Sequence, residues 1–322
     1  MWMCNSHFGR WLMSSSCGMI DPVLDAGADL SFHWSDIGGR AMNLSRQIVL
    51  AAALGLLALG SASAQAPLRI FDAHLHYNQE PNPFYDLDKV LEIFRRNNIS
   101  GILATSRPNK GTHQLVEAKA PGLWVVPFIR PYRTRDDVQN WSNDPAISDL
   151  IESEYKRGYY VGVGELHIYG PAAERPVVKH AVNFATERDL YILAHCDEQA
   201  LLILHKHNAK AKIIWAHTGF STSPVRVAEL LNTYPALMAE LSYRGGITDG
   251  SGKISPDWVQ LFAKYPDRFL LGSDTWVPER WASYDQIMGG YRAWLAQLSD
   301  DQARRIAHGN AERLFKGKLP TN

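Results

Sequence analysis

The chain has 322 residues, 46% of them hydrophobic and 20% charged, which is the composition of a globular protein rather than a disordered or fibrous one. The 33 basic and 33 acidic residues give a formal net charge of zero. A balanced charge provides no electrostatic attraction to nucleic acid or to an anionic membrane surface, so neither is expected as a partner.

The N-terminal segment has the order of a secretory signal peptide. A short stretch from Met42 with one basic residue precedes an uninterrupted apolar run at 48–59, and the small residues at 62–64 match a cleavage site. The apolar run is shorter than the ~20 residues of a membrane span, so no stable span is expected in the mature protein. We therefore predict a signal peptide over 42–64 and a periplasmic or secreted location. A buried helix or a membrane anchor is the alternative.

Residues 1–41 lie upstream of this signal and show no clear periodicity. Our hypothesis is that Met42 is the true start and that 1–41 is an extension that is not native. The mature chain, 65–322, then has nearly the ~250 residues of a typical (β/α)8 barrel. It keeps one cysteine, Cys196, and so has no intramolecular disulfide.

Short apolar runs alternate with longer amphipathic segments along the mature chain. The apolar runs, interpreted as strands, are 68–74, 101–106, 123–130, 159–165, 191–195, 212–217, 237–242 and 269–274. The segments with helical periodicity are 87–97, 136–157, 176–188, 198–207, 225–233, 258–265, 284–298 and 301–308. Most apolar runs do not alternate with polar residues, which is typical of parallel strands buried on both faces. The pattern favours a single α/β domain, a closed (β/α)8 TIM barrel, over an open doubly wound sheet.

Polar residues that commonly bind metals stand at the ends of these strands. They are His74 and His76 after the first strand, Glu165 and His167 at the fourth, His195 at the fifth, His217 at the sixth and Asp274 at the eighth. In a barrel all strand C-termini open on one rim, so these side chains are expected to converge. His74 and His76 stand at i and i+2 and therefore point the same way from a strand. Imidazole and carboxylate groups together suit a divalent transition metal, zinc among them.

Each of these signals is weak alone. A single histidine after an apolar run is more often a core or surface residue, and a single aspartate at a strand end can cap the next helix. The joint pattern at the ends of several strands is what predicts a metal centre.

The motifs resemble those of the amidohydrolase superfamily, in its amidohydrolase-related branch. The resemblance covers nearly all of 65–322 and rests on FDAHLH (71–76), GVGELH (162–167), ILAHCD (192–197), IIWAHTG (213–219), LLGSDT (270–275) and GNAERLF (309–315). It implies that His74, His76, His195 and Asp274 bind metal. It also implies that His217 either binds a second metal or polarises the substrate carbonyl. Glu165 stands where the family has a bridging lysine or glutamate, so one or two ions are expected.

The implied reaction is hydrolysis of an ester, lactone or amide bond of a small molecule by metal-activated water. Asp274 would move the proton, and His217 would stabilise charge on the carbonyl oxygen. Four residues near the strand ends are predicted to bind the substrate: Arg107, Arg130, Tyr132 and Arg244. Arginine binds carboxylates and phosphates, which favours an anionic substrate, while pairing of these arginines with loop carboxylates is an equal alternative.

Two other functions fit the same residues. The amidohydrolase-related branch also contains metal-dependent decarboxylases that resemble this chain. A periplasmic barrel that binds a metal or ligand without turnover is a candidate from a different class. The sequence does not fix the substrate, the identity of the metal or whether the chain forms a homo-oligomer.

Overall fold

The computed structural model describes residues 67–80 and 82–318, so the predicted extension at 1–41 and the signal peptide at 42–64 lie outside the described residues. The described part contains a sheet of eight parallel strands in the order β1-β2-β3-β4-β5-β6-β7-β8. The strands are β1 (Ile70–Leu75), β2 (Ile99–Ala104), β3 (Trp124–Ile129), β4 (Gly162–Ile168), β5 (Tyr191–Cys196), β6 (Lys212–Trp215), β7 (Met238–Glu240) and β8 (Phe269–Leu270).

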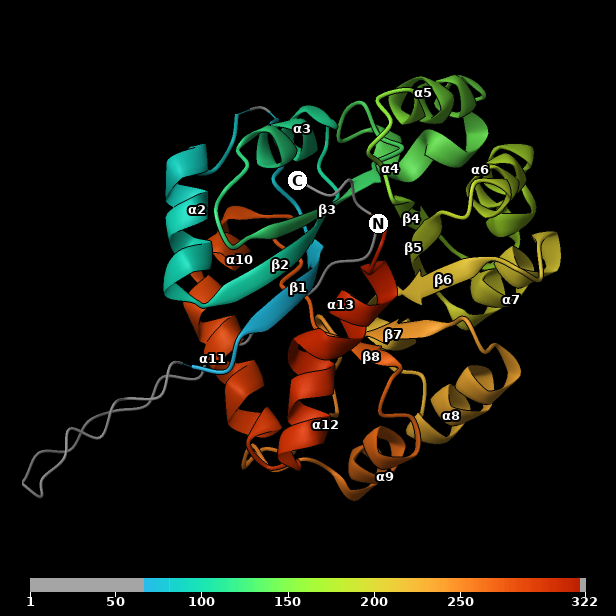
Figure 1. The fold of residues 1–322 in the computed structure, drawn as a ribbon. Coiled ribbons are helices and arrows are strands. Elements are labelled where there is room, and N and C mark those ends of the chain that lie inside the picture. The colour runs from blue at the N-terminus through green and yellow to red at the C-terminus, as the bar shows by residue number, and fades with distance from the viewer. Residues whose placement is uncertain (1–66, 81, 319–322) are drawn as a thin grey trace, which may run out of the picture. The chain divides into compact units, whose positions relative to one another are not determined.

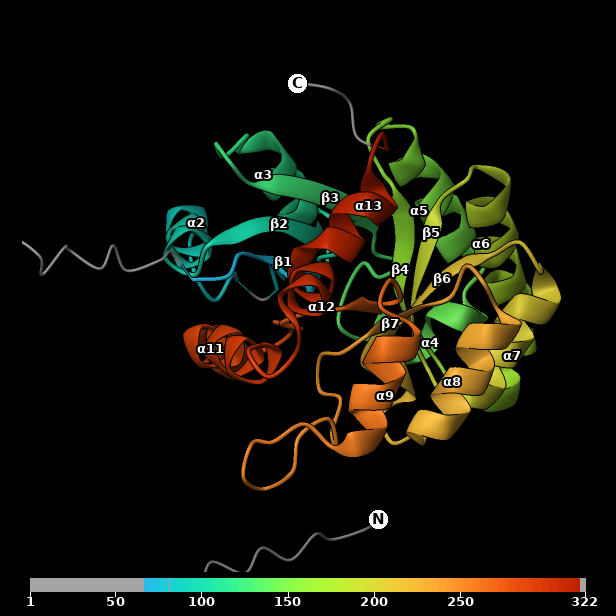
Figure 2. The same ribbon diagram turned by 60° about the horizontal axis from the view of Figure 1, so that its bottom comes forward.

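The sheet closes on itself between its first and last strands. Asp72 on β1 bridges Leu271, just after β8, and the Ala73 amide donates to the Leu271 carbonyl at 2.7 Å. Helices connect consecutive strands and surround the sheet, as Figure 1 and the rotated view in Figure 2 show. The prediction of a single (β/α)8 barrel is confirmed.

The helices mostly follow the strands one by one. They are α2 (Leu87–Arg96), α3 (Lys110–Glu117), α4 (Asp137–Asn140), α5 (Ala146–Tyr155), α6 (Pro176–Glu187), α7 (Glu198–His207), α8 (Pro224–Thr233), α9 (Pro256–Lys264), α10 (Pro278–Ala282), α11 (Tyr284–Leu295), α12 (Asp300–Arg304) and α13 (Asn310–Phe315). Side chains cap several N-termini: Asp86, Asp197 and Ser223 each accept from the amide three residues later. No helix of the described part is long and apolar enough to cross a membrane.

The single helix predicted over 136–157 is wrong. The segment forms α4, the short 3-10 turn η1 (Trp141–Asn143) and then α5. Proline has no amide hydrogen and disfavours helical backbone in the residue before it, so Pro145 ends one element and opens the next. Asp144 is accordingly extended, with φ −105° and ψ 107°. The short helices α3, α10 and α13 were not predicted from periodicity.

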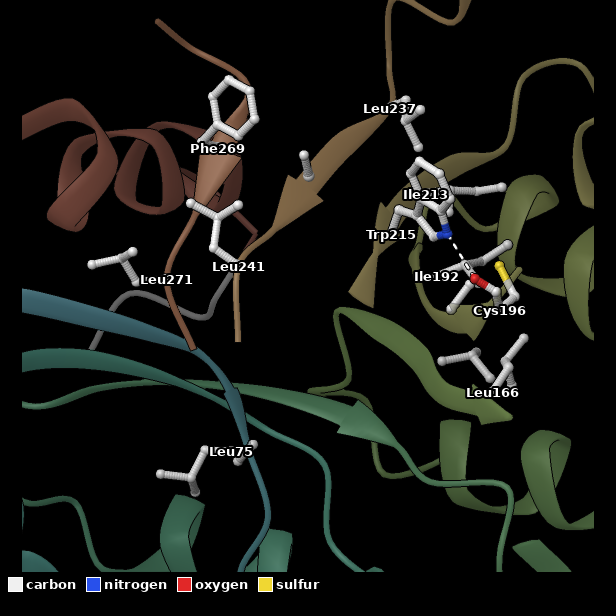
Figure 3. Packing of buried hydrophobic residues seen from close by; sticks show 14 of the residues in the cluster. Leu75, Leu166, Ile192, Cys196, Ile213, Trp215, Leu237, Leu241, Phe269 and Leu271 are labelled. Atoms are coloured by element: carbon white, nitrogen blue, oxygen red, sulfur yellow. Dashed lines mark hydrogen bonds between the residues drawn. The ribbon is translucent and has the colours of Figure 1, made fainter. Parts of the chain in front are cut away.

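Buried apolar side chains form two clusters. The outer cluster lies between strands and helices and includes Leu75 and Trp215, whose indole donates to the Cys196 carbonyl at 2.9 Å (Figure 3). The inner cluster fills the barrel, and the ring of Phe315 on α13 lies 5.4 Å from that of Tyr191 and 5.9 Å from that of Phe71. Since these partners stand at the beginnings of β5 and β1, α13 covers that end of the barrel. The polar residues lie toward the other end.

Candidate metal centre

His74 on β1 and His76 just after it point into the barrel, as the packing of the residue between them indicates. Leu75 packs in the outer cluster (Figure 3), so the flanking His74 and His76 face the opposite way. His74 Nε2 lies 3.2 Å from Glu165 Oε1, and His76 Nε2 lies 3.3 Å from Glu165 Oε2. The chelating pair expected from the sequence therefore meets Glu165 in the middle of β4.

Asp274 completes a buried group with these three residues. His74, His76, Glu165 and Asp274 each offer one ligand atom, and these atoms lie within 4.8 Å of one another. Asp274 Oδ1 is 3.0 Å from His76 Nε2, and none of the four residues is more than 4% exposed. The Nε2 atoms of His74 and His76 lie near these carboxylates but form no hydrogen bond with any described residue, although buried polar atoms are normally hydrogen-bonded.

A second set of imidazoles also contacts Glu165. His195 Nδ1 is 2.7 Å from Glu165 Oε1 and 3.1 Å from His217 Nε2. His167 Nε2 is 3.0 Å from Glu165 Oε2, and Glu165, His167 and His195 form a further group with metal-ligand spacing. Glu165 therefore belongs to two possible ligand groups.

Glu240, at the end of β7, is a site residue that the sequence reasoning missed. His74 Nδ1 donates to Glu240 Oε2 at 3.0 Å, and the His217 amide donates to the same oxygen at 3.2 Å. The side chain is fully buried. The sequence contains a signal for it: Glu240 is an acidic residue near the C-terminal end of the apolar run 237–242, the position at which the other strands carry their predicted metal ligands.

Gly272 makes room for this contact. A Cβ placed on Gly272 would lie 2.5 Å from Glu240 Oε1 and 2.5 Å from His74 Cβ, closer than packed atoms approach. Glycine after β8 therefore allows β1, β7 and β8 to meet at the centre.

The centre has more buried negative than fixed positive charge. Glu165, Glu240 and Asp274 are buried carboxylates, and in the described part of the chain the cation that pairs with them is Arg130, whose Nη1 lies 3.0 Å from Glu165 Oε2. Burial opposes ionisation of Glu165, but His167, His74 and Arg130 outweigh it and hold its pKa well below the usual range. Unbalanced buried charge is costly, so this donor set fits a divalent cation.

The buried carboxylates in turn raise the pKa of His74. Burial lowers the pKa of His74, but Glu165, Asp274 and Glu240 outweigh that effect and raise the pKa well above 6.5. A proton on His74 therefore supplies part of the positive charge that a metal ion would otherwise provide.

Several residues at the strand ends have left-handed backbone. The φ angles are 57° for His217, 49° for Asp274 and 51° for Tyr243. This conformation costs a non-glycine residue roughly 1–3 kcal/mol and is concentrated at functional sites. The Asp274 amide donates to the His74 carbonyl at 2.7 Å, which holds the turn against β1.

The residues predicted to bind substrate lie in different environments. Arg107 forms an ion pair with Glu80, and Arg130 forms one with Glu165. Tyr132 is fully buried, and its hydroxyl accepts from the His167 amide at 2.7 Å. Arg107 therefore pairs with a loop carboxylate, which was the alternative to substrate binding. The role of the four residues in substrate binding stays a prediction.

Arg244 differs from these arginines. Its guanidinium donates to the Thr222 carbonyl and lies 5.0 Å from the ring centre of Trp258, and no carboxylate of the described residues pairs with it.

Comparison with known proteins places this chain in a family. The profile of the family described as "Amidohydrolase" matches residues 157–317. Among solved structures, an amidohydrolase from Burkholderia multivorans with bound HEPES is 16% identical, with a TM-score of 0.54 over 78% of this chain and 99% of that chain. A second crystal form of it, with bound zinc, gives 15% identity and a TM-score of 0.52 over the same shares.

A TatD homologue from Escherichia coli K12 is 16% identical, with a TM-score of 0.55 over 79% of this chain and 99% of that chain. No curated protein sequence matches significantly. At these identities the solved structures establish the barrel fold. The family profile adds the sequence relationship and confirms the predicted resemblance: the chain belongs to the amidohydrolase family.

Proposed function

We propose that this protein is a metal-dependent hydrolase that cleaves an ester, lactone or amide bond of a small substrate with water. The observation that carries the proposal is the convergence of His74, His76, Glu165 and Asp274 in a buried group with two unpartnered Nε2 atoms. Membership of the amidohydrolase family supports it, because the family is typically metal-dependent.

We assign the metal to the six residues that the sequence pattern singled out, with zinc as the first choice. They are His74, His76, Glu165, His195, His217 and Asp274. Zinc is bound in the amidohydrolase from Burkholderia multivorans, which supports this choice. A divalent ion in this position supplies a Lewis acid and lowers the pKa of water toward neutrality.

Asp274 is the proposed general base and acid. Burial raises its pKa, but His74 and His76 outweigh burial, and the net pKa lies well below 3.8. The carboxylate is therefore ionised at neutral pH, able to accept a proton from water and to pass it to the leaving group.

His217 is the proposed donor to the carbonyl oxygen of the substrate. Its Nδ1 donates to the Ser242 carbonyl at 2.8 Å, which fixes the ring and leaves Nε2 facing the centre. Burial lowers the pKa of His217, but the contact with Glu165 and the charge of Glu240 raise it overall. In a centre with one ion, the protonated ring donates from Nε2 to an oxygen on which negative charge develops; in a centre with two ions, Nε2 is unprotonated and binds the second ion instead.

A substrate panel tests the proposal. The zinc-reconstituted protein is assayed on lactones, esters and amides, with carbon dioxide release from carboxylic acids followed in parallel. We expect hydrolysis that disappears when a chelator removes the metal. Carbon dioxide release without hydrolysis would make the protein a decarboxylase, and metal binding without either reaction would make it a binding protein.

The secreted or periplasmic location also remains our proposal, resting on the predicted signal peptide at 42–64. Mass spectrometry of the native protein tests it. We expect a mature N-terminus near residue 65, and a peptide from within 11–40 would contradict it.

A further inference from the structure

A cleft of about 610 Å³ lies at the segment that follows β7, against α10 and α11. Its volume falls in the range of ~300–1,000 Å³ that small-molecule sites occupy. Tyr243 and Arg244 come from the segment after β7, Arg280 comes from α10, and Ile287 and Trp294 come from α11. The residues that line the cleft therefore include two arginines together with apolar side chains.

The charge of the cleft is of one sign. Arg244 and Arg280 are its charged lining residues, and no aspartate or glutamate lines it. Arg244 donates to the Thr222 carbonyl and Arg280 to the Ser273 carbonyl, and within the described part of the chain neither pairs with a carboxylate. By contrast, Arg107 and Arg133 at the same rim pair with loop carboxylates.

Arg244 has an unused donor within this environment. Its Nε is buried and has no hydrogen-bond partner among residues 67–80 and 82–318. Burial lowers the pKa of Arg244, and no nearby carboxylate offsets that effect. A partly buried guanidinium without a carboxylate partner gains charge-assisted hydrogen bonds when an anion binds beside it.

Tyr243 connects the cleft with the metal centre. The Arg280 guanidinium carbon lies 4.1 Å from the centre of the Tyr243 ring, and the His217 ring centre lies 5.9 Å from the same point. Arg280 Nε also donates at 3.0 Å to the carbonyl of Ser273, the residue before Asp274. An anion bound by Arg280 would therefore lie one side chain away from the proposed catalytic groups.

We propose that this cleft binds an anionic oxygen group of the substrate, a carboxylate or a phosphate, through Arg244 and Arg280. The scissile bond of the same molecule lies beyond Tyr243, at His217 and Asp274, while Ile287 and Trp294 contact its apolar part. The inference rests on the proposed hydrolase activity and adds the substrate class: small organic acids. Arg280 is a specificity residue that the sequence pattern did not indicate.

Hydrolysis of two matched esters tests the proposal. Monomethyl glutarate carries one free carboxylate and dimethyl glutarate carries none, so their kcat/KM ratio measures recognition of the anion. We expect the wild type to prefer the monoester, and Arg244→Gln or Arg280→Gln to lower its kcat/KM by roughly 10- to 100-fold, with a much smaller effect on the diester. Lysine at either position keeps the charge and should restore part of the preference.

The matched control is Arg226→Gln. Arg226 lies on α8, pairs with Glu198 and Glu229, and does not line the cleft. We expect this variant to keep the wild-type ratio of the two esters. An equal fall for both esters in the Arg244 and Arg280 variants, or no fall, would overturn the proposal.

Direct binding separates this inference from the hydrolase proposal. Glutarate and inorganic phosphate are titrated by calorimetry into metal-loaded and metal-free protein. We expect metal-free protein to bind at least one of these anions, and Arg244→Gln to weaken that binding at least ~10-fold. The anion that binds more tightly identifies the acid group.

If the anions bind only to the metal-loaded protein, and bind the arginine variants as tightly as the wild type, then the metal and not the cleft binds them. This result would overturn the inference. Arginine-dependent binding without hydrolysis of any ester, lactone or amide would instead overturn the proposed activity and leave the cleft assignment standing.

Discussion

The imidazole of His74 donates from Nδ1 to Glu240 Oε2 across 3.0 Å, and both side chains are fully buried. The contact joins the ends of β1 and β7. It directs His74 Nε2 toward Glu165, which lies 3.2 Å away. When Nδ1 carries the proton, the Nε2 lone pair is available to a metal, as in carboxylate–histidine–metal triads. Glu240 therefore orients the proposed metal ligand His74 by binding Nδ1, the ring nitrogen that does not face the metal.

Replacing Glu240 tests this relationship. Glu240→Gln removes the charge that fixes the His74 ring, so we expect metal affinity to fall by about 10- to 100-fold. Affinity is measured by competition with a chromogenic chelator, and circular dichroism checks the fold. Glu154→Gln is the matched control, because Glu154 contacts His113 at 2.9 Å in a pair outside the centre. Equal affinities in both variants would remove Glu240 from this role.

Replacing Asp274 separates metal binding from proton transfer. Asp274→Asn keeps an oxygen atom near His76 but loses the basicity of the carboxylate, so we expect most of the metal to remain and turnover to fall by roughly 10²- to 10⁴-fold. Steady-state kinetics and metal content are measured on the same preparation. Full activity in this variant would contradict the assignment of Asp274 as the general base.

Replacing Glu165 reports how many ions the centre holds. Glu165 contacts imidazoles of both possible ligand groups, so we expect Glu165→Ala to weaken metal binding or to remove one equivalent. Titration of zinc into metal-free protein gives both the affinity and the stoichiometry. A fall from two equivalents to one would identify a bridging carboxylate, and unchanged binding would exclude Glu165 from the ligand set.

His205 on α7 provides a prediction about stability. The residue is 5% exposed, neither ring nitrogen has a hydrogen-bond partner, and its ring stacks on Tyr234 with 3.8 Å between ring centres. Burial lowers the pKa of His205 from 6.5 to about 4. As the pH falls from 6.5 toward 4, the unfolded chain takes up a proton that the folded chain does not, so the folded state loses stability.

His205→Phe keeps the stacking and removes the titration. Between about pH 7 and pH 4.5, we expect the variant to lose about 2 kcal/mol less of its unfolding free energy than the wild type. Urea unfolding of both proteins at the two pH values measures the difference. Parallel losses in both proteins would show that His205 does not titrate in this way.

The barrel and the convergence of its polar residues could be predicted because each signal is local. Runs such as 191–195 lack polar alternation, and His195 stands at the end of its run, where a barrel rim must lie. A short range of sequence therefore determines both the strand and the position of the ligand. The prediction of one helix over 136–157 was wrong for a local reason too, because Pro145 interrupts the helix despite the helical periodicity around it.

The contacts that could not be predicted join residues far apart in the chain. His74 and Glu240 are separated by 166 positions and meet only because the barrel closes. Pairing of Arg107 with Glu80, and the absence of such a partner at Arg244, depend on loop conformations that residue types do not determine. The sequence could therefore indicate which arginines lie near the rim, but not which of them lacks a carboxylate partner among the described residues.

Metal content is the most direct test of the central claim. The purified full chain, reconstituted with zinc and then dialysed, is analysed by inductively coupled plasma mass spectrometry beside His76→Ala and His180→Ala. His180 lies on α6, pairs with Glu152 and stands outside the centre, so it is the control. We predict at least one equivalent of zinc in the wild type and in His180→Ala, and a large loss in His76→Ala. Wild-type protein without bound metal after reconstitution would contradict the account.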